Sequence, residues 1–130
     1  MSDFELYMSE PSFARGARLV VVESPYASLG GDPSYLRECL RWCVERGYSP
    51  YASHGLLTQP GVLDDHATPE RNVGMQLGFA WRTAAEATIV FTDFGISEGM
   101  RAGIAHAKSM GCPLYYVRCG CFVDGPDAPA

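Results

Sequence analysis

The residues best suited to chemistry follow one another just after a polar turn that ends an apolar run at 88–91. Ser97 stands where a helix N-cap is expected, because its hydroxyl can accept hydrogen bonds from the free amides of the next turn. Such amides favour anions, and Gly99, which has no side chain, would let a phosphate approach closely. Glu98 adds a carboxylate, and Met100 follows in the same turn. This stretch is therefore a candidate anion site with a carboxylate beside it.

Strands and helices that alternate along the chain must position this turn. Short runs rich in β-branched and aromatic residues predict buried strands, of which the most apolar is expected at the centre of the sheet. Units in which a strand, a helix and a second strand follow one another form parallel sheets with right-handed crossovers. We therefore predict an α/β fold with a flavodoxin-like order (second, first, third, fourth strand), a parallel sheet of four to five strands and helices on both faces. The strands are expected at 18–23, 48–52, 88–91 and 114–117.

The chain is expected to form one domain with two peripheral segments. Residues 18–118 hold the predicted strands and helices, whereas 1–17 and 119–130 show no clear periodicity and are expected to be an N-terminal arm and a flexible tail. Within the domain, residues 53–67 predict a long irregular loop, and loops of this length are usually functional or mobile.

Composition excludes several classes of partner. The 130 residues carry a formal charge of −5 and no basic run, which argues against a surface for extended nucleic acid. No segment has the length of a membrane span, and residues 1–17 lack the apolar core of a secretory signal, so a cytoplasmic location is expected. The five cysteines show no paired C-x-x-C spacing. We therefore expect reduced thiols, no metal and no other cofactor.

Parallel topology would gather polar residues at one edge of the sheet, since ligands bind at the carboxyl ends of such strands. Asp93 ends the third strand, where a carboxylate can accept from sugar hydroxyls or simply stabilise a turn. His54 can donate to a phosphate or a base, although a histidine taken alone more often has a structural role. The segment Ser24, Pro25 and Tyr26 follows the first strand, and Tyr26 is suited to flank a ring.

Four segments in matching order resemble one superfamily. They are SPYAS, YASHGLLTQPGVLDD, PERNVGMQLG and ISEGMRAGIAHAKSMGCP, which together span most of residues 18–117. The chain is similar to the nucleoside 2-deoxyribosyltransferase-like group, whose relatives include nucleoside 5′-monophosphate N-glycosidases. The resemblance implies a Rossmann-like domain, usually a homo-oligomer, that binds a nucleoside or nucleotide and attacks the ribosyl C1′ with a glutamate. It also favours a ligand contact for Tyr26 and matches Arg71 to an arginine common in short relatives.

The resemblance also implies where the reacting glutamate should lie. Counting from Ser97 and Gly99, and back from the end of the helix, places it at Gly103, which has no carboxyl group. Glu98 is the nearest substitute, but residues five apart lie on different faces of a helix, so we favour a helix-dipole role for it. Two functions stay open: a non-catalytic nucleotide binder, and an N-glycosidase or deoxyribosyltransferase that uses Glu98.

The remaining candidates lie on or near the long loop. Asp64 and Asp65 can bind a ribose or cap the loop, and Arg71, in the first turn of the following helix, can bind either aspartate or the ligand. Together they are interpreted as a lid. The apolar face of that helix, with Trp81, Gly74 and Gly78, is expected to pack against a second subunit.

Overall fold

The computed structural model describes residues 16–64 and 66–125, which form an α/β fold around a five-stranded mixed sheet. The order of the strands is β2-β1-β3-β4-β5, and the first four are parallel, as the sequence predicts. β3 lies at the centre, and β1 is paired on both edges. The strands are β1 (Arg18–Glu23), β2 (Tyr48–Tyr51), β3 (Ala87–Phe91), β4 (Leu114–Arg118) and β5 (Cys121–Val123).

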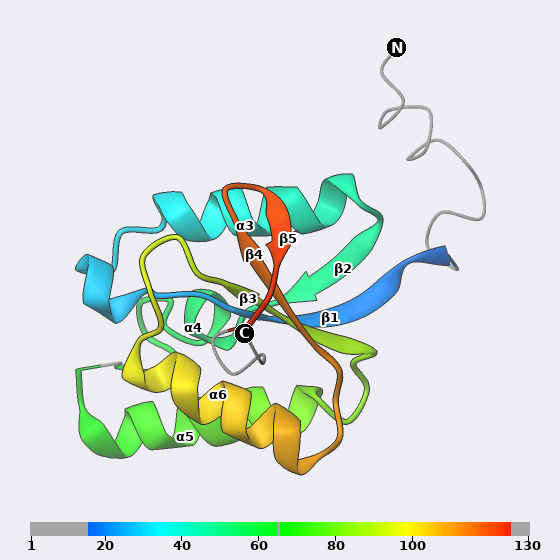
Figure 1. The fold of residues 1–130 in the computed structure, drawn as a ribbon. Coiled ribbons are helices and arrows are strands. Elements are labelled where there is room, and N and C mark those ends of the chain that lie inside the picture. The colour runs from blue at the N-terminus through cyan, green and yellow to red at the C-terminus, as the bar shows by residue number, and fades with distance from the viewer. Residues whose placement is uncertain (1–15, 65, 126–130) are drawn as a thin grey trace.

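Helices lie on both faces of the sheet (Figure 1). α3 (Ser34–Glu45) covers one face, whereas α5 (Thr68–Trp81) and α6 (Glu98–Ser109) lie on the other. Two short elements, η1 (Ala27–Leu29) and α4 (Ser53–Leu56), follow β1 and β2. α6 begins at Glu98, directly after Ser97, which is the cap that the sequence predicts.

The alternation of side chains along the strands divides the core between the two faces. Val20, Val22, Ile89 and Phe91 pack with buried residues of α3. Val90, the neighbour of Ile89 and Phe91, instead packs with Met100 and Ile104 of α6. Full burial of each such side chain stabilises the fold by about 1.5–3 kcal/mol. Whether a residue stands at an odd or an even position along its strand therefore decides on which face of the sheet its side chain packs.

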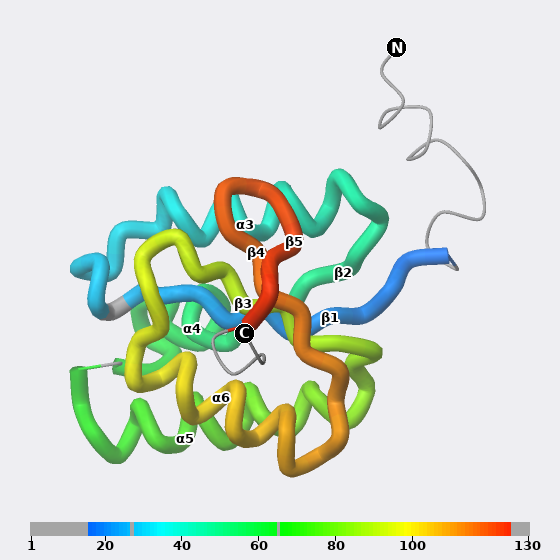
Figure 2. Tube along the Cα trace, viewed as in Figure 1, coloured from blue at the N-terminus to red at the C-terminus, as the bar shows by residue number. Residues whose placement is uncertain are grey.

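Three expectations about the connecting segments need correction or lie outside the described residues. The flexible tail expected from 119 onward is wrong for Cys121–Val123, because β5 turns back and pairs antiparallel with β4 (Figure 2). The loop expected at 53–67 begins with the short helix α4. Most of the expected N-terminal arm, residues 1–15, lies outside the described residues. Across the part of the chain that is described, no helix is both long and apolar enough to cross a membrane.

Candidate functional site

A pocket of about 410 Å³ lies at the carboxyl edge of the parallel strands. The segments after β1 and β3 leave the sheet at this edge, and the second of them leads into the N-terminus of α6 (Figure 2). In the order β2-β1-β3, this is the point where the chain connections diverge to either side, and open α/β sheets bind ligands at such points. The predicted site residues that line the pocket are Ser24, Tyr26, His54, Arg71, Ser97, Glu98, Gly99 and Met100.

The N-terminus of α6 forms one wall of the pocket. Ser97 caps the helix, because its Oγ accepts from the backbone amide of Met100 at 3.3 Å. A Cβ added to Gly99 would lie 3.7 Å from Nη2 of Arg71, so the guanidinium group of α5 stands beside this helix end. Met100 is 1% exposed and packs mainly in the core with Val90. Partly free backbone amides and a cation thus meet on one wall, and both favour an anion.

The segment after β1 forms a second wall. Ser24 is buried, and its Oγ lies 3.2 Å from Nε2 of His54 in α4. The rings of His54 and Tyr26 are tilted against each other with centroids 5.6 Å apart. Pro25 is buried and does not line the pocket. Ring surfaces and polar atoms therefore alternate on this wall.

A buried ion pair that the sequence reasoning missed lies deeper in the site. Glu23 ends β1 and lines the pocket, and its Oε1 accepts from Nη2 of Arg82 at 2.8 Å. The Arg82 side chain is fully buried, and it also donates to Oγ1 of Thr88 at 3.0 Å and pairs with Nδ1 of His106 at 2.8 Å. The His106 ring stacks on Phe79, which lines the same pocket. Each of the three guanidinium nitrogens therefore has a hydrogen-bond partner.

This environment changes the acidity of two groups. Burial raises the pKa of Glu23 to about 7, and the opposite charge and hydrogen bond of Arg82 offset only part of the rise. Burial, together with the Arg82 charge, lowers the pKa of His106. His106 is therefore neutral at pH 7, and its Nδ1 can accept from Arg82. Glu23, in contrast, changes its charge near neutral pH, the range in which a carboxyl group serves best as an acid or base.

Gly103 leaves the space that Glu23 occupies. A Cβ built on Gly103 would lie 2.7 Å from Oε2 of Glu23 and closer still to Oε1. The position where the resemblance expects a glutamate is therefore filled by a carboxyl group that comes from β1. The sequence held a signal for this arrangement, because Glu23 shares the strand parity of Val21, which also faces the pocket.

Besides Pro25, two predicted site residues of the described chain, Asp93 and Asp64, do not line this pocket. Asp93 lies on the α3 side of the sheet, where Oδ2 accepts from the Tyr35 hydroxyl at 2.5 Å and Oδ1 from the Cys119 amide at 2.6 Å. Although burial raises it, these hydrogen bonds lower the pKa of Asp93 below its ordinary value. Asp93 therefore does not line this pocket, and its hydrogen bonds agree with the alternative role in stabilising a turn.

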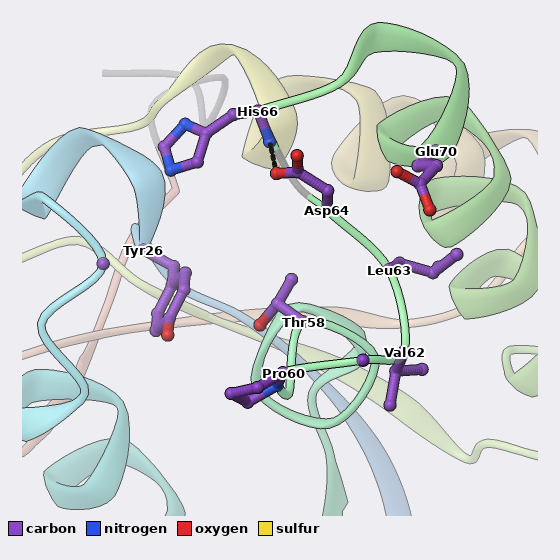
Figure 3. Close-up of a pocket in the computed structure, with 10 residues that line it drawn as sticks. Tyr26, Thr58, Pro60, Val62, Leu63, Asp64, His66 and Glu70 are labelled. Carbon is purple, nitrogen blue, oxygen red and sulfur yellow. Dashed lines mark hydrogen bonds between the residues drawn. The ribbon is translucent and has the colours of Figure 1, made fainter.

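Asp64 lines a neighbouring hollow of about 460 Å³, which Figure 3 shows. Its Oδ1 accepts from the backbone amide of His66 at 2.9 Å, so it holds the loop in the capping role that the sequence allowed. Tyr26 lines both hollows, and Figure 3 shows Thr58 of the loop opposite its ring. Asp65 lies outside the described residues. Within 16–64 and 66–125, no cluster of histidine, cysteine or acidic side chains could hold a metal ion.

Fold and pocket together define an α/β protein with a ligand-type pocket at the carboxyl edge of its parallel strands. The chain belongs to the family described as Domain of unknown function (DUF7768), whose model matches residues 18–117. Comparisons with curated proteins and with solved structures give no match.

Proposed function

We propose that this chain binds a nucleoside 5′-monophosphate, or a closely related nucleotide, in the pocket between β1, α4, α5 and α6. One observation carries the proposal: the Arg71 guanidinium stands beside Gly99 at the capped N-terminus of α6. A phosphate group there would meet backbone amides, a hydroxyl and a cation together. We interpret the fold as a Rossmann-like three-layer sandwich, in which this position is the usual one for a phosphate.

The remaining walls suit the rest of a nucleotide. The Tyr26 and His54 rings offer surfaces against which a base can pack. Glu98 is exposed at the pocket rim, where a carboxylate can accept from ribose hydroxyls. The resemblance to the nucleoside 2-deoxyribosyltransferase-like group supports the same class of ligand. The five free cysteines support a cytoplasmic location, since reduced thiols are usual there.

Calorimetric titration with nucleoside 5′-monophosphates, nucleosides and inorganic phosphate tests this proposal. We expect monophosphates to bind more tightly than the matching nucleosides, and Arg71→Gln to weaken monophosphate binding by roughly tenfold or more, as loss of a charge-assisted hydrogen bond does. Arg101→Gln is the matched control, because Arg101 is exposed on α6 and does not line the pocket. Equal losses in the two variants, or no binding by the parent protein, would reject the proposal.

The pocket also favours a second function, cleavage of an N-glycosidic bond. The supporting observation is the Glu23 carboxyl group in the pocket wall, with a pKa raised by burial to about 7. Glu98, the carboxylate that the sequence offered for this reaction, is exposed in the first turn of α6. We therefore rank catalysis through Glu23 above catalysis through Glu98.

A further inference from the structure

A separate hollow lies on the α3 side of the sheet, and the proposed function does not use it. Its volume is about 440 Å³, which is within the range of small-molecule pockets. It lies between α3 and the segments that follow β3 and β4. Figure 1 shows α3 beside the turn between β4 and β5, where Nε1 of Trp42 donates to the carbonyl oxygen of Gly120 at 2.9 Å. We call this space the α3-side hollow.

Four aromatic rings line the α3-side hollow. The ring centroids of Tyr35 and Phe94 are 4.7 Å apart, and their planes are 84° apart. Those of Trp42 and Phe91 are 5.6 Å apart, with an angle of 87°. Phe94 is 62% exposed and Phe91 is buried, so the hollow reaches from the surface to the core. A bound group would therefore meet ring carbons on more than one side.

The charged side chains that line the α3-side hollow are both acidic. Glu38 is exposed on α3, and Asp93 follows β3. Asp93 is held in place, because Oδ2 accepts from the Tyr35 hydroxyl at 2.5 Å and Oδ1 from the Cys119 amide at 2.6 Å. None of the described residues that line this hollow is a lysine, arginine or histidine. The hollow therefore favours a cation and disfavours a phosphate.

Aromatic walls restrict the kind of cation that fits. A bare ammonium group has three N–H donors, which would lose their water against the rings at a high cost. Methyl groups on the nitrogen replace these donors and pack on the rings, while the positive charge still interacts with the ring faces. The Arg46 guanidinium already lies over the Trp42 ring, 3.8 Å from its centroid, and does not line the hollow. Tyr35 and Phe94 are therefore the rings best placed for a ligand near the surface.

We propose that the α3-side hollow binds a trimethylammonium group. Its methyl groups pack against the rings of Tyr35 and Phe94, and its charge is balanced by Glu38 and Asp93. Such a group occurs in small molecules such as choline and in trimethylated lysine side chains, and the same chemistry recognises both. The inference does not depend on nucleotide binding, because the two spaces share no lining residue.

NMR titration of the ¹⁵N-labelled protein with choline tests the proposal. We expect saturable shifts of the amide signals of Phe94 and Gly120, which line the hollow. The matched ligand is 3,3-dimethylbutan-1-ol, which has the shape of choline without its charge, and it should bind more weakly by roughly tenfold or more. Equal affinity for the two ligands would show that the hollow only accepts apolar groups, and would overturn the inference. Absence of saturable shifts with choline would overturn it as well.

Two exposed side chains allow the site to be changed without disturbing the core. Phe94→Leu keeps an apolar side chain but removes the ring, and Glu38→Gln removes one charge. Each should weaken choline binding by about two- to fivefold. Tyr115→Leu and Glu86→Gln are the matched controls, because both residues are exposed and lie outside the hollow. Unchanged affinity in Phe94→Leu and Glu38→Gln, or equal losses in the controls, would overturn the inference.

A peptide with one trimethyllysine and the same peptide with unmodified lysine distinguish the two sources of the group. Tighter binding of the methylated peptide than of choline would assign the site to a protein side chain. Weaker binding of that peptide would assign the site to a free small molecule. Equal binding of the two peptides together with absence of choline binding would overturn the inference, because the methyl groups would then have no effect.

Discussion

Gly103→Ala should destabilise the protein, although replacing a helical glycine by alanine normally does the opposite. Gly103 is buried in α6, and an added methyl group would lie 2.7 Å from Oε2 of Glu23 and closer to Oε1. The carboxyl group must therefore leave its place against Arg82. Arg82 has no exposed side-chain surface, so it would lose its counter-charge inside the protein.

The magnitude follows from two opposing effects. Helix propensity favours alanine over glycine by about 1 kcal/mol. Separation of a buried ion pair costs about 3–5 kcal/mol, because one charge stays buried without its partner. The free energy of unfolding should therefore fall by about 2–4 kcal/mol at pH 8, where Glu23 is ionised. In a Glu23→Ala background the methyl group meets no carboxylate, so Gly103→Ala should raise the free energy of unfolding by about 1 kcal/mol.

Urea unfolding of the parent, the two single variants and the double variant measures this coupling directly. Gly99→Ala is the control, because it lies in the same helix and its added Cβ would make only an ordinary contact with Arg71, at 3.7 Å. If Gly103→Ala stabilises the parent as much as it stabilises the Glu23→Ala variant, the Glu23 carboxyl group does not occupy this space. Gly103→Glu would place a glutamate where the resemblance expects one, but it should also destabilise the protein, because its Cβ would overlap the Glu23 carboxyl group.

Three further outcomes are expected. Burial raises the pKa of Glu23 from 4.5 to about 7, so the stability that its neutral form gives is complete below pH 4.5 and is lost as the pH rises through about 7. In urea unfolding, the free energy of unfolding of the parent should therefore fall by about 3 kcal/mol across this range relative to that of Glu23→Gln. Tyr35→Phe should lower the free energy of unfolding by about 1 kcal/mol, because it removes the hydrogen bond to Asp93, and should leave nucleotide affinity unchanged. A loss of affinity in this variant would mean that Asp93 contributes to nucleotide binding. Leu77→Glu, in the exposed apolar stripe of α5, should convert an oligomer to a monomer in sedimentation; a parent that is already monomeric would contradict self-association through this face.

Local patterns were sufficient to predict the four parallel strands and the edge of the sheet that carries the pocket. The apolar runs matched the four parallel strands, and the cap at Ser97 fixed the start of α6. Parallel topology alone then brought residues as distant as Ser24 and Gly99 to the same pocket. The short strand β5 was missed because three residues after a glycine turn carry almost no periodic signal.

Side-chain direction explains the two main errors at the site. Asp93 lies two residues after Phe91, and Phe91 faces α3, so the same parity carries Asp93 away from the pocket. Glu23 has the opposite parity to Val22 and points into the pocket. Its partner Arg82 is 59 residues away in sequence, and an arginine at the end of a helix is normally exposed. Only the three-dimensional packing against Gly103 reveals the pair.

Packing also changes the interpretation of the α5 glycines. Gly78 is buried, and a Cβ there would meet Ser53 of α4, so this glycine permits contact within the chain and not with a second subunit. Gly74 similarly faces Leu63 of the loop. The exposed apolar stripe of α5 that is left for the second subunit expected from the sequence is Val73, Leu77 and Trp81.

A crystal structure of the protein with a nucleoside 5′-monophosphate is the most direct test of the central claim. The account predicts the phosphate within hydrogen-bonding distance of the amides at Ser97 and Gly99 and of the Arg71 guanidinium. We also expect C1′ of the nucleotide to lie against the Glu23 carboxyl group in the pocket wall. A nucleotide bound with its phosphate away from α6, or with C1′ remote from Glu23, would contradict the account.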